Sequence, residues 1–589
     1  MGSSNGYDAE RKGGHIGKKI ILGGVSVMLV VAVVVAVVTV AHRHKSSDGL
    51  PGENGNNGGI STSVKAVSTI CAPTDHRESC ENVLNEAVKS NGGNTDPKEL
   101  VKAAFHAAIE EVKSVFNLSI GLGKKESDPM TKMALSDCED LMQSAIQELQ
   151  ASFSAVGDKE LHTLSDRVDD IKNWLSAVLS YQQACMDGVP HPEVKSAISN
   201  GMINATQLTS NALAIVSEIS AIMSTFNIPL NFNSNKRRLL ENDGRLHDMD
   251  EKGFPTWLST ADRKLLAYKD TQKLRPNVVV AQDGRGNYRT INDALKNIPK
   301  SRSGRYIIYV KAGIYREQVL IDNDMENIFM YGDGPRRTVV TASKNFVDGT
   351  PTYQTATFAA EGNGFICKSM GFRNTAGPEK HQAVALRVKS DMSAFYNCRM
   401  DAYQDTLYVQ THRQFYRNCI ISGTVDFIFG DSAVVIQNSK LIVRKPMDNQ
   451  QNIVTAQGRT DKREPTGIVI HNCRIVPETR LFNTRFTTKT YLGRPWKEYS
   501  RTIIMESTIA DFIQPDGYMP WDGDFALKTL YYAEYANRGP GARTTRRVRW
   551  PGVKVISRRE ALQYTVGSFI NGKYWLRSTG APYMLGLRA

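Results

Sequence analysis

The chain has 589 residues, a formal net charge of +13 and a pI near 9.2. This length excludes a single ordinary domain, for which about 150 residues is typical, although one solenoid can take up about 300 residues by adding coils. The positive charge indicates an acidic partner or surface, but it does not identify which one.

An uncharged stretch, Ile20–Ala41, is the first predicted element, and basic residues flank it on both sides. Its 22 residues can span a bilayer, since about 20 are needed as a helix. The stretch is longer than the apolar core of a cleaved signal peptide, so we interpret it as a type II signal anchor. Residues 1–19 are then a cytoplasmic tail and residues 42–59 a flexible linker. The basic flanks on both sides weaken any orientation drawn from charge alone.

Two features downstream of this stretch favour a lumenal location. Asn117 and Asn204 each begin a glycosylation sequon, Asn-Leu-Ser and Asn-Ala-Thr. The cysteine spacing is compatible with disulfides, which form in oxidising compartments.

Residues 60–227 are predicted to be an all-α bundle. Apolar residues recur at steps of 3 and 4 along Phe105–Phe116 and Val168–Cys185, as in amphipathic helices that pack around a core. Four cysteines of this region allow three connectivities: Cys71, Cys80, Cys138 and Cys185. Among these we favour Cys71–Cys80, closing an N-terminal hairpin, with Cys138–Cys185 joining two helices.

Residues 228–276 are predicted to be a processing linker. They contain two basic pairs that are each followed by Leu-Leu: Arg237, Arg238, Leu239, Leu240, and Arg263, Lys264, Leu265, Leu266. Exposed basic sites in a linker are where processing proteases cut. The pattern therefore predicts a removable N-terminal half and a C-terminal working half.

A local repeat organises the C-terminal half, residues 277–589. It shows in four related pieces around Asn397, Asn418, Asn438 and Asn472, at steps of 21, 20 and 34 residues. Periods in the twenties with short apolar runs favour a solenoid of stacked coils, most simply a parallel β-helix.

Two aspartates, Asp405 and Asp426, are separated by 21 residues, which is the local repeat length. Because neighbouring strands lie about 4.7–4.9 Å apart, the repeat predicts carboxylates about 5 Å apart on one face. Gln382 precedes Asp405 by 23 residues, so it is expected in the layer before. A structural polar ladder or a pair of turn residues is the alternative interpretation of this spacing.

A set of motifs carries a family resemblance. They lie at residues 364–366, 374–378, 382–387, 403–407, 423–430 and 492–496. On these motifs, the chain from Asn277 onward resembles plant pectin methylesterases (pectinesterases), and Ile60 to about Asn227 resembles the inhibitor domain that precedes such enzymes as a pro-region. The resemblance implies a multidomain fold: an all-α four-helix bundle with two disulfides, then a right-handed parallel β-helix, both following the membrane-spanning helix.

The resemblance assigns Asp426 as nucleophile, Asp405 as general acid and then base, and Gln382 and Gln404 as oxyanion-hole donors. Two close carboxyls resist ionising together, and Arg494 beside Asp426 would keep the charge there, leaving the proton on Asp405. The matching substrate-contact residues are Thr352, Gln382, Arg494 and Trp496.

Several positions have two possible roles on the sequence alone. Phe427 and Phe429 either wall the cleft or belong to the core. Ser439 stands where many relatives have a cysteine, so no bridge from position 439 to Cys473 can form, and Cys367, Cys398, Cys419 and Cys473 have either another pairing or none. A late basic segment is either a solvated loop or a polyanion groove: Arg538, Arg543, Arg546, Arg547, Arg549, Lys554, Arg558 and Arg559.

The expected function is hydrolysis of methyl esters of homogalacturonan in the plant cell wall, without a cofactor or metal. The expected partners are methyl-esterified homogalacturonan, a processing protease, inhibitor proteins and, before processing, the membrane, but no nucleic acid. The bundle is expected to silence the esterase until it is cut off, after which the enzyme is extracellular.

Two other classes compete with this interpretation. Carboxyls about 5 Å apart also suit a retaining glycoside hydrolase on a β-helix, although the glutamine pair and Arg494 favour an esterase. A non-enzyme reading makes the bundle the active part of an inhibitor or wall-binding module.

Overall fold

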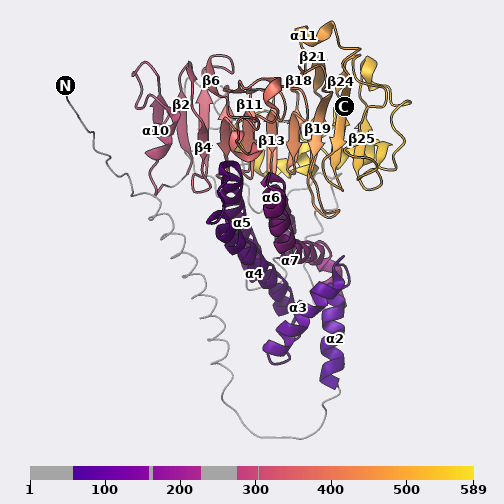
Figure 1. Ribbon diagram of the computed structural model, residues 1–589. Helices are drawn as coiled ribbons and strands as arrows, with labels where there is room; N and C mark the ends of the chain where they lie inside the picture. The colour runs from indigo at the N-terminus through magenta and orange to yellow at the C-terminus, as the bar shows by residue number, and fades with distance from the viewer. Residues whose placement is uncertain (1–57, 158–163, 227–274, 303, 589) are drawn as a thin grey trace, which may run out of the picture. The chain divides into compact units, whose positions relative to one another are not determined.

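The computed structural model describes residues 58–157, 164–226, 275–302 and 304–588 (Figure 1). The chain divides after Ser61, and residues 62–589 form one compact unit, which the description below concerns. The predicted span Ile20–Ala41 and the predicted cleavage sites at 237–240 and 263–266 lie outside the described residues. Of the helices within those ranges, none is both long and apolar enough to cross a membrane.

The N-terminal part of this unit is helical. Its four long helices pack each against the next, and the first also packs against the last, which closes a four-helix bundle. The first long helix begins at Pro97, where the side chain of Asp96 accepts a hydrogen bond from the Lys98 amide at 3.0 Å. The helices are α2 (Gly58–Cys71), α3 (Arg77–Ser90), the long α4 (Pro97–Gly123), α5 (Pro129–Gly157), α6 (Leu164–Gly188) and α7 (Pro192–Ser217), and α8 (Ile219–Thr225).

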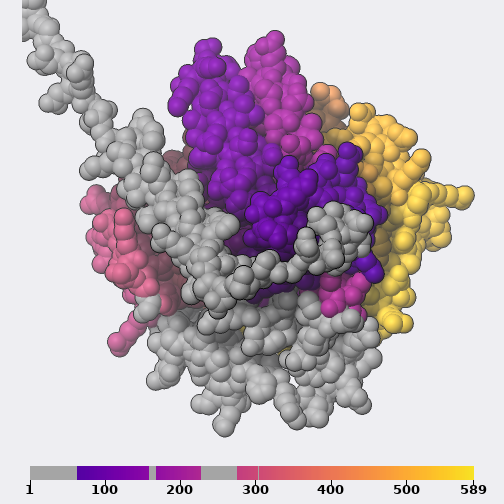
Figure 2. Space-filling model, turned by 90° about the horizontal axis from the view of Figure 1, so that it is seen from below, coloured from indigo at the N-terminus to yellow at the C-terminus, as the bar shows by residue number. Residues whose placement is uncertain are grey.

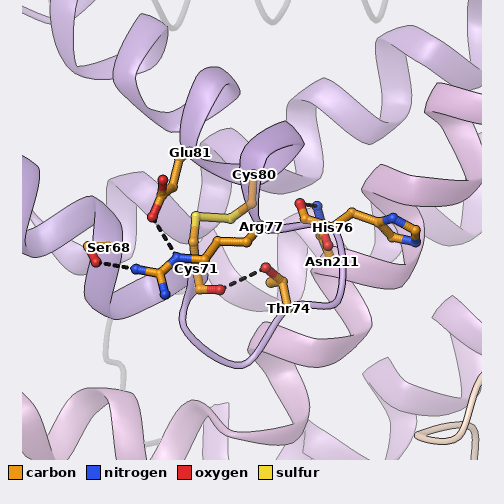
Figure 3. The surroundings of a disulfide bond; sticks show 8 residues. All are labelled: Ser68, Cys71, Thr74, His76, Arg77, Cys80, Glu81 and Asn211. Carbon is orange, nitrogen blue, oxygen red and sulfur yellow. Dashed lines mark hydrogen bonds and ion pairs between the residues drawn. A yellow bond between two sulfur atoms is a disulfide. The ribbon is translucent and has the colours of Figure 1, made fainter.

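Two disulfides join elements of the bundle with the pairing expected above. Cys71–Cys80 closes the turn between α2 and α3, and Cys138–Cys185 joins α5 to α6. Around the first disulfide, the Thr74 hydroxyl donates to the Cys71 carbonyl at 2.7 Å, and Asn211 of α7 donates to the His76 carbonyl at 3.0 Å (Figure 3). The turn from residue 71 to 80 is therefore held in one conformation against the bundle.

The C-terminal part is a right-handed parallel β-helix made of three parallel sheets. The first sheet contains β1 (Val278–Val280), β2 (Tyr306–Val310), β5 (Ile328–Gly332), β8 (Ile366–Lys368), β11 (Ser393–Tyr396), β14 (Arg413–Arg417), β17 (Ala433–Gln437), β20 (Gly467–His471), β23 (Arg501–Met505), β25 (Tyr531–Tyr535) and β26 (Val553–Val555). The second contains β4 (Val319–Ile321), β7 (Phe358–Ala360), β10 (Leu386–Val388), β13 (Leu407–Val409), β16 (Ile428–Gly430), β19 (Asn452–Gln457) and β22 (Thr490–Pro495). The third contains β3 (Gly313–Tyr315), β6 (Thr338–Ala342), β9 (Gly371–Asn374), β12 (Arg399–Asp401), β15 (Ile420–Gly423), β18 (Lys440–Val443), β21 (Arg474–Pro477) and β24 (Thr508–Ile509).

Short helical segments accompany the coils. They are α10 (Ile291–Lys296), η4 (Thr352–Thr355), η5 (Pro378–Lys380), α11 (Thr479–Phe482), η6 (Pro540–Ala542), α12 (Arg558–Leu562), α13 (Val566–Phe569), α14 (Gly572–Trp575) and η7 (Leu576–Thr579). The last of them, α12 to η7, pack on the outer face of the first sheet through Ile570, Trp575 and Leu576.

The repeated asparagines have a conformational reason. Asn397, Asn418, Asn438 and Asn472 each follow a strand of the first sheet, and their φ angles lie between 51° and 55°. Asparagine tolerates this left-handed conformation better than most residues, so the same corner recurs in successive coils.

The solenoid interior is apolar and contains the four cysteines that sequence analysis left open. Cys367, Cys398, Cys419 and Cys473 are buried and unpaired, and the sulfur atoms of Cys367 and Cys398 lie 3.8 Å apart. Ser439 faces Cys473, whose sulfur accepts a hydrogen bond from the Ser439 amide at 3.4 Å.

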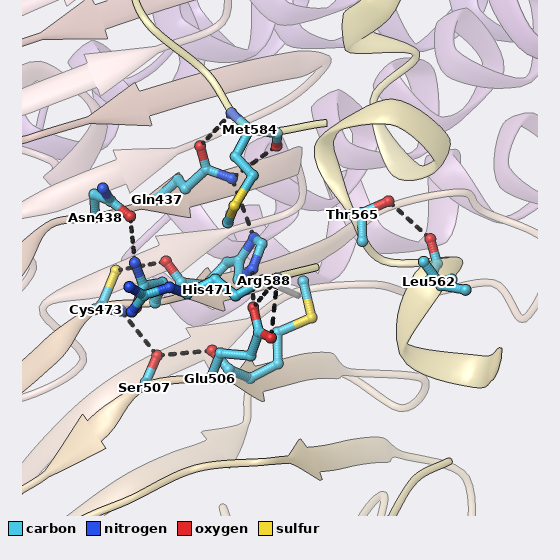
Figure 4. A network of polar contacts seen from close by, with 12 residues as sticks. Gln437, Asn438, His471, Cys473, Glu506, Ser507, Leu562, Thr565, Met584 and Arg588 are labelled. Carbon is cyan, nitrogen blue, oxygen red and sulfur yellow. Dashed lines mark hydrogen bonds and ion pairs between the residues drawn. The ribbon is translucent and has the colours of Figure 1, made fainter. Parts of the chain in front are cut away.

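The C-terminal tail is fastened to polar side chains at the ends of the first-sheet strands (Figure 4). The Gln437 side chain exchanges two hydrogen bonds with the backbone of Met584, at 2.9 and 3.0 Å. Glu506 contacts His471 at 2.7 Å and accepts from the Arg588 amide. These contacts close the outer side of the last coils.

Candidate active site

The second sheet aligns the side chains of the candidate site. Its strands β10, β13, β16, β19 and β22 are in register, and one outward-facing row runs through Arg387, Tyr408, Phe429, Ala456 and Arg494. Tyr408, Phe429 and Ala456 form an apolar cluster outside the solenoid, which is separate from the interior core.

Asp405 and Asp426 lie in adjacent coils at the entrance to this sheet. Each precedes its strand by two residues, and the strands pair Leu407 with Ile428. The Asp405 amide donates to the carbonyl of Val425 at 3.0 Å. Both aspartates have positive φ, 62° and 48°, a conformation that costs free energy and persists only where surrounding structure enforces it.

Arg494, on β22, binds Asp426 directly. Its Nε and Nη2 donate to the two carboxylate oxygens at 2.9 and 2.5 Å, a two-pronged contact. The guanidinium also lies over the ring of Trp521, 4.3 Å from the ring centroid. Arg494 is thus held on one side by a carboxylate and on the other by an aromatic face.

The two carboxyls differ in electrostatic environment although both are buried. Burial raises the pKa of Asp405 well above its ordinary value, and the charge of Asp426 raises it further. Burial also raises the pKa of Asp426, but the charge and hydrogen bonds of Arg494 pull that pKa down. The arrangement favours a carboxylate at Asp426 and a proton on Asp405.

Gln382 and Gln404 pair with each other across adjacent coils in an isolated parallel bridge. Gln382 therefore lies in the coil before Asp405, as expected, and its partner is the residue that precedes Asp405. The 23-residue step exceeds the 21-residue register of β10 and β13, in which Leu386 pairs with Leu407. Neither side-chain amide is hydrogen bonded to another of the described residues, so the donors of both remain open to a ligand.

Aromatic side chains border the dyad. Trp496 packs edge-on against Phe429 with ring centroids 6.0 Å apart, and Phe429 stacks on Tyr408 at 4.3 Å. Phe429 thus belongs to the outer cluster, whereas Phe427 is in the interior core, which settles the two alternatives left open above. Thr352 is half-buried in η4, whose next residue, Tyr353, packs against the same outer cluster.

Trp521, Tyr408 and Arg387 are not among the residues predicted above for the site. Tyr408 and Arg387 carry a signal in retrospect, because they lie 21 residues apart and share the outward row with Phe429. Trp521 lies in the loop between β24 and β25, outside the repeat, and no spacing in the sequence connects it to Arg494.

The sequon residues lie in helices. Asn117 of α4 and Asn204 of α7 are both exposed, which leaves their side chains accessible; glycosylation itself stays a prediction. The late basic segment is mixed: Arg547 is buried and binds Glu534 at 2.7 Å, whereas Arg546 and Lys554 are exposed.

The parallel β-helix holds two carboxyls in adjacent coils, and an arginine binds one of them. A pair of open amides lies beside them. This combination defines an esterase-type site. Residues 277–573 match the family model described as pectinesterase, and residues 65–215 match the one described as plant invertase/pectin methylesterase inhibitor. The chain belongs to the pectinesterase family and carries an inhibitor-like domain ahead of the esterase domain.

Similar proteins agree with this assignment. The probable pectinesterase/pectinesterase inhibitor 21 of Arabidopsis thaliana is 44% identical over 592 residues, covering 100% of this chain and 85% of the relative. Pectinesterase 3 of Citrus sinensis is 42% identical over 546 residues, covering 91% of this chain and 90% of the relative. The structure of a pectin methylesterase from carrot is 53% identical with a TM-score of 0.53, and the match covers 54% of this chain and 100% of that one.

Proposed function

We propose that this protein hydrolyses the methyl esters of homogalacturonan, releasing methanol and de-esterified pectate, with Asp426 as nucleophile and Asp405 as acid and then base. The observation that carries the proposal is the asymmetric carboxyl pair: Arg494 binds only Asp426, and the two residues are in adjacent coils. Membership of the pectinesterase family supports the same reaction.

The reaction takes two steps. The Asp426 carboxylate attacks the ester carbonyl, and the amides of Gln382 and Gln404 stabilise the developing oxyanion without neutralising the nucleophile. As the tetrahedral intermediate collapses, Asp405 donates its proton to the leaving methoxide, which departs as methanol. Asp405, now ionised, takes a proton from water, which hydrolyses the acyl-enzyme and restores Asp426.

The borders of the site suit a methylated sugar chain. The faces of Trp496 and Phe429 are apolar surfaces on which pyranose rings can rest. Thr352 and the amides of Gln382 and Gln404 would supply polar contacts to the sugar hydroxyls. A charged nucleophile within an apolar cleft favours a neutral ester over a free carboxylate, since the latter is repelled.

The test compares methanol release by the parent chain and by Asp426→Asn, each cut within residues 228–276 at an introduced protease site. We expect loss of at least about 10³-fold in kcat, since removal of a covalent nucleophile leaves only binding and oxyanion stabilisation. Asp511→Asn, an exposed carboxylate that pairs with Arg485, is the matched control. Unchanged methanol release by Asp426→Asn, or release of reducing ends in place of methanol, would reject the proposal.

We further propose that the bundle silences the esterase in cis until the linker is cut near Leu240 or Leu266. Three contacts beside the cleft support this. Gln354, in η4 with Thr352, donates to Asp137 of α5 at 2.8 Å. Lys497, next to Trp496, binds Asp187 of α6 at 2.8 Å. Tyr353 packs against the bundle core. A sugar chain that enters the cleft would compete with these contacts.

The site of action follows from the same proposal. Pectin is a component of the plant cell wall, so the cut enzyme works outside the cell. The stretch Ile20–Ala41 would hold the uncut chain on the secretory membrane as a type II anchor, and the sequons at Asn117 and Asn204 would be glycosylated on the lumenal side.

A further inference from the structure

A hollow of about 470 Å³ on the last coils of the solenoid has no role in the reaction above. We call it the basic hollow. It is lined by Arg459, Lys462, Tyr499, Arg501, Lys528, Thr529, Leu530, Tyr531, Pro551, Gly552, Lys554 and Tyr564. These residues come from several separate segments of the sequence, and among the described residues that line the hollow none is acidic.

Two arginines of the basic hollow have unused donors. Arg459 is only 4% exposed, and its Nε has no hydrogen-bond partner among the described residues; the same holds for the Nε of Arg501. Both backbone amides donate to the side-chain oxygen of Gln457, at 3.1 and 2.7 Å, which fixes the two residues side by side. Both Nε atoms are themselves buried, so they do not touch a ligand, but their unsatisfied N–H groups leave the two guanidinium charges incompletely compensated.

The acids nearest to these arginines do not neutralise them fully. Asp431 and Glu464 are buried, and burial raises the pKa of both carboxyls, with the charge of Asp431 adding to the rise at Glu464. The pKa of Arg459 is lowered to about 10, first by burial and then by the charge of Arg501. The charges of Glu464, Asp431 and Asp461 act in the opposite direction on Arg459, but burial and Arg501 outweigh them. The lining described above itself holds five cations and no acid, which suits an external anion.

Aromatic rings accompany the cations. Tyr531 and Tyr564 lie with ring centroids 5.8 Å apart, and the Lys554 ammonium lies 5.4 Å from the centroid of Tyr531. Tyrosine faces and hydroxyls suit pyranose rings, whereas the cations suit carboxylates. A ligand that offers both is a chain of uronic acid residues.

A carboxylate of this chain already occupies one rim of the basic hollow. Asp75, in the turn closed by Cys71–Cys80 (its neighbours are drawn in Figure 3), binds Lys462 at 2.8 Å and Arg463 at 2.7 Å. These pairs lower the pKa of Asp75 through the hydrogen bond from Arg463 first, so the carboxylate is held in its charged form. The rim thus binds a carboxylate within the folded chain.

One wall of the basic hollow lies next to Trp496 of the candidate active site. The ring of Trp496 lies against Gly458, where an added Cβ would be 2.9 Å from the ring, and Arg459 follows directly in the chain. The Tyr499 amide donates to the Arg459 carbonyl at 3.1 Å, which joins the loop after Trp496 to the wall of the hollow. A sugar chain that passes Trp496 would reach these cations next.

We propose that the basic hollow is a second binding site, outside the catalytic cleft, for the carboxylates and rings of a de-esterified uronate chain. The identity of the chain as pectate rests on the proposed function. The site would hold a stretch that has already lost its methyl groups while the next ester enters the cleft.

The test is calorimetric titration of the full chain with a de-esterified oligogalacturonate. Lys528→Gln combined with Lys554→Gln removes two exposed cations of the hollow, and we expect binding roughly three- to tenfold weaker. The control variant, Lys296→Gln combined with Lys300→Gln, makes the same change in charge on exposed residues. These residues lie in and just after α10, at the other end of the solenoid. The control variant should bind the oligomer as tightly as the parent does.

With the galacturonate oligomers, any one of three results would overturn the proposal: equal binding by the hollow variant and the parent, an equal loss in both double variants, or equal binding of a fully methyl-esterified oligomer of the same length. Polyglutamate of matched charge is the probe without sugar rings, and binding as tight as that of oligogalacturonate would also overturn it. Methanol release, measured on the same samples after linker cleavage, is a separate readout. Its absence would reject the esterase and leave the binding site standing.

Discussion

At the scale of single residues, the site depends on two aspartate side chains that have different electrostatic surroundings. Asp405 and Asp426 share burial, coil position and left-handed backbone, and they differ in that Arg494 binds one of them. The guanidinium also lies over the ring of Trp521, 4.3 Å from its centroid. The arginine therefore assigns the roles of attacker and proton donor.

Replacing Arg494 by Gln should move the acidic limb of the kcat/KM profile upward. The arginine lowers the pKa of Asp426, so without it that pKa rises and the nucleophile ionises only at higher pH. We expect a displacement of about one to three pH units. Arg494→Lys keeps the charge but loses the two-pronged contact, and its limb should lie between those of the parent and Arg494→Gln. An unmoved limb in the Gln variant would show that Arg494 does not set the ionisation of Asp426.

At the scale of elements, the contact between α5 and η4 contains a buried acid. Asp137 accepts from Gln354 at 2.8 Å, and burial raises its pKa to about 7. Asp140 and Glu361 also raise this pKa. Gln354 and Arg387 lower it, but burial has the larger effect. Asp137 thus carries a raised pKa at the contact between helix α5 and the solenoid.

The folded chain should become less stable as the pH rises. Asp137 has a folded pKa above its unfolded value of 3.8, so its contribution is fully present below about pH 4 and is lost as pH rises through about 7. The change is at most about 4 kcal/mol. Asp137→Asn should flatten the dependence of the unfolding free energy on pH over this range, measured by denaturant titration.

Glu110→Gln, which removes an exposed carboxylate paired with Lys113, is the control for that series and should leave the slope as in the parent. A parent chain whose stability is constant between pH 4 and 7 would contradict the assignment of a raised pKa to Asp137.

At the scale of the whole molecule, the bundle holds the solenoid through pairs of opposite charge. Asp75 meets Lys462 and Arg463, Asp187 meets Lys497, and Asp170 meets Arg413 at 2.8 Å. In each pair the bundle supplies the acid and the solenoid the base. Figure 2 shows the bundle, in indigo and magenta, beside the yellow surface of the last coils.

Latency should weaken when these pairs are removed. In the chain cut within the linker, Asp75→Asn with Asp187→Asn should raise the fraction of free esterase, with roughly two- to tenfold weaker retention of the bundle. Glu86→Gln with Glu193→Gln, on exposed helix positions, makes the same charge change as a control. Methanol release and gel filtration report the two states.

Mass spectrometry of the active form extracted from the wall should find the bundle absent, and an active species with an intact N-terminus would reject processing.

Much of the architecture could be predicted because it depends on local periodicity. The asparagine steps reflect a left-handed corner that recurs in each coil, and the 21-residue spacing of Asp405 and Asp426 equals the register of β13 and β16. The bundle followed from apolar stripes, which need only the helical period. Several expectations fall on residues outside the described ranges and stay predictions: the tail of residues 1–19, the anchor, residues 42–57 of the predicted linker and the two cleavage sites.

The sequence by itself determined the solenoid, the bundle and the adjacency of the two aspartates, since each depends on a period that can be counted along the chain. Only the tertiary structure decided that Gln382 pairs with Gln404, that Trp521 lies on Arg494, and that five cations from separate segments surround one hollow. The physical reason is that loops of unequal length interrupt the period between these segments. Which side chains then meet is settled by packing in three dimensions, and no spacing in the sequence records it.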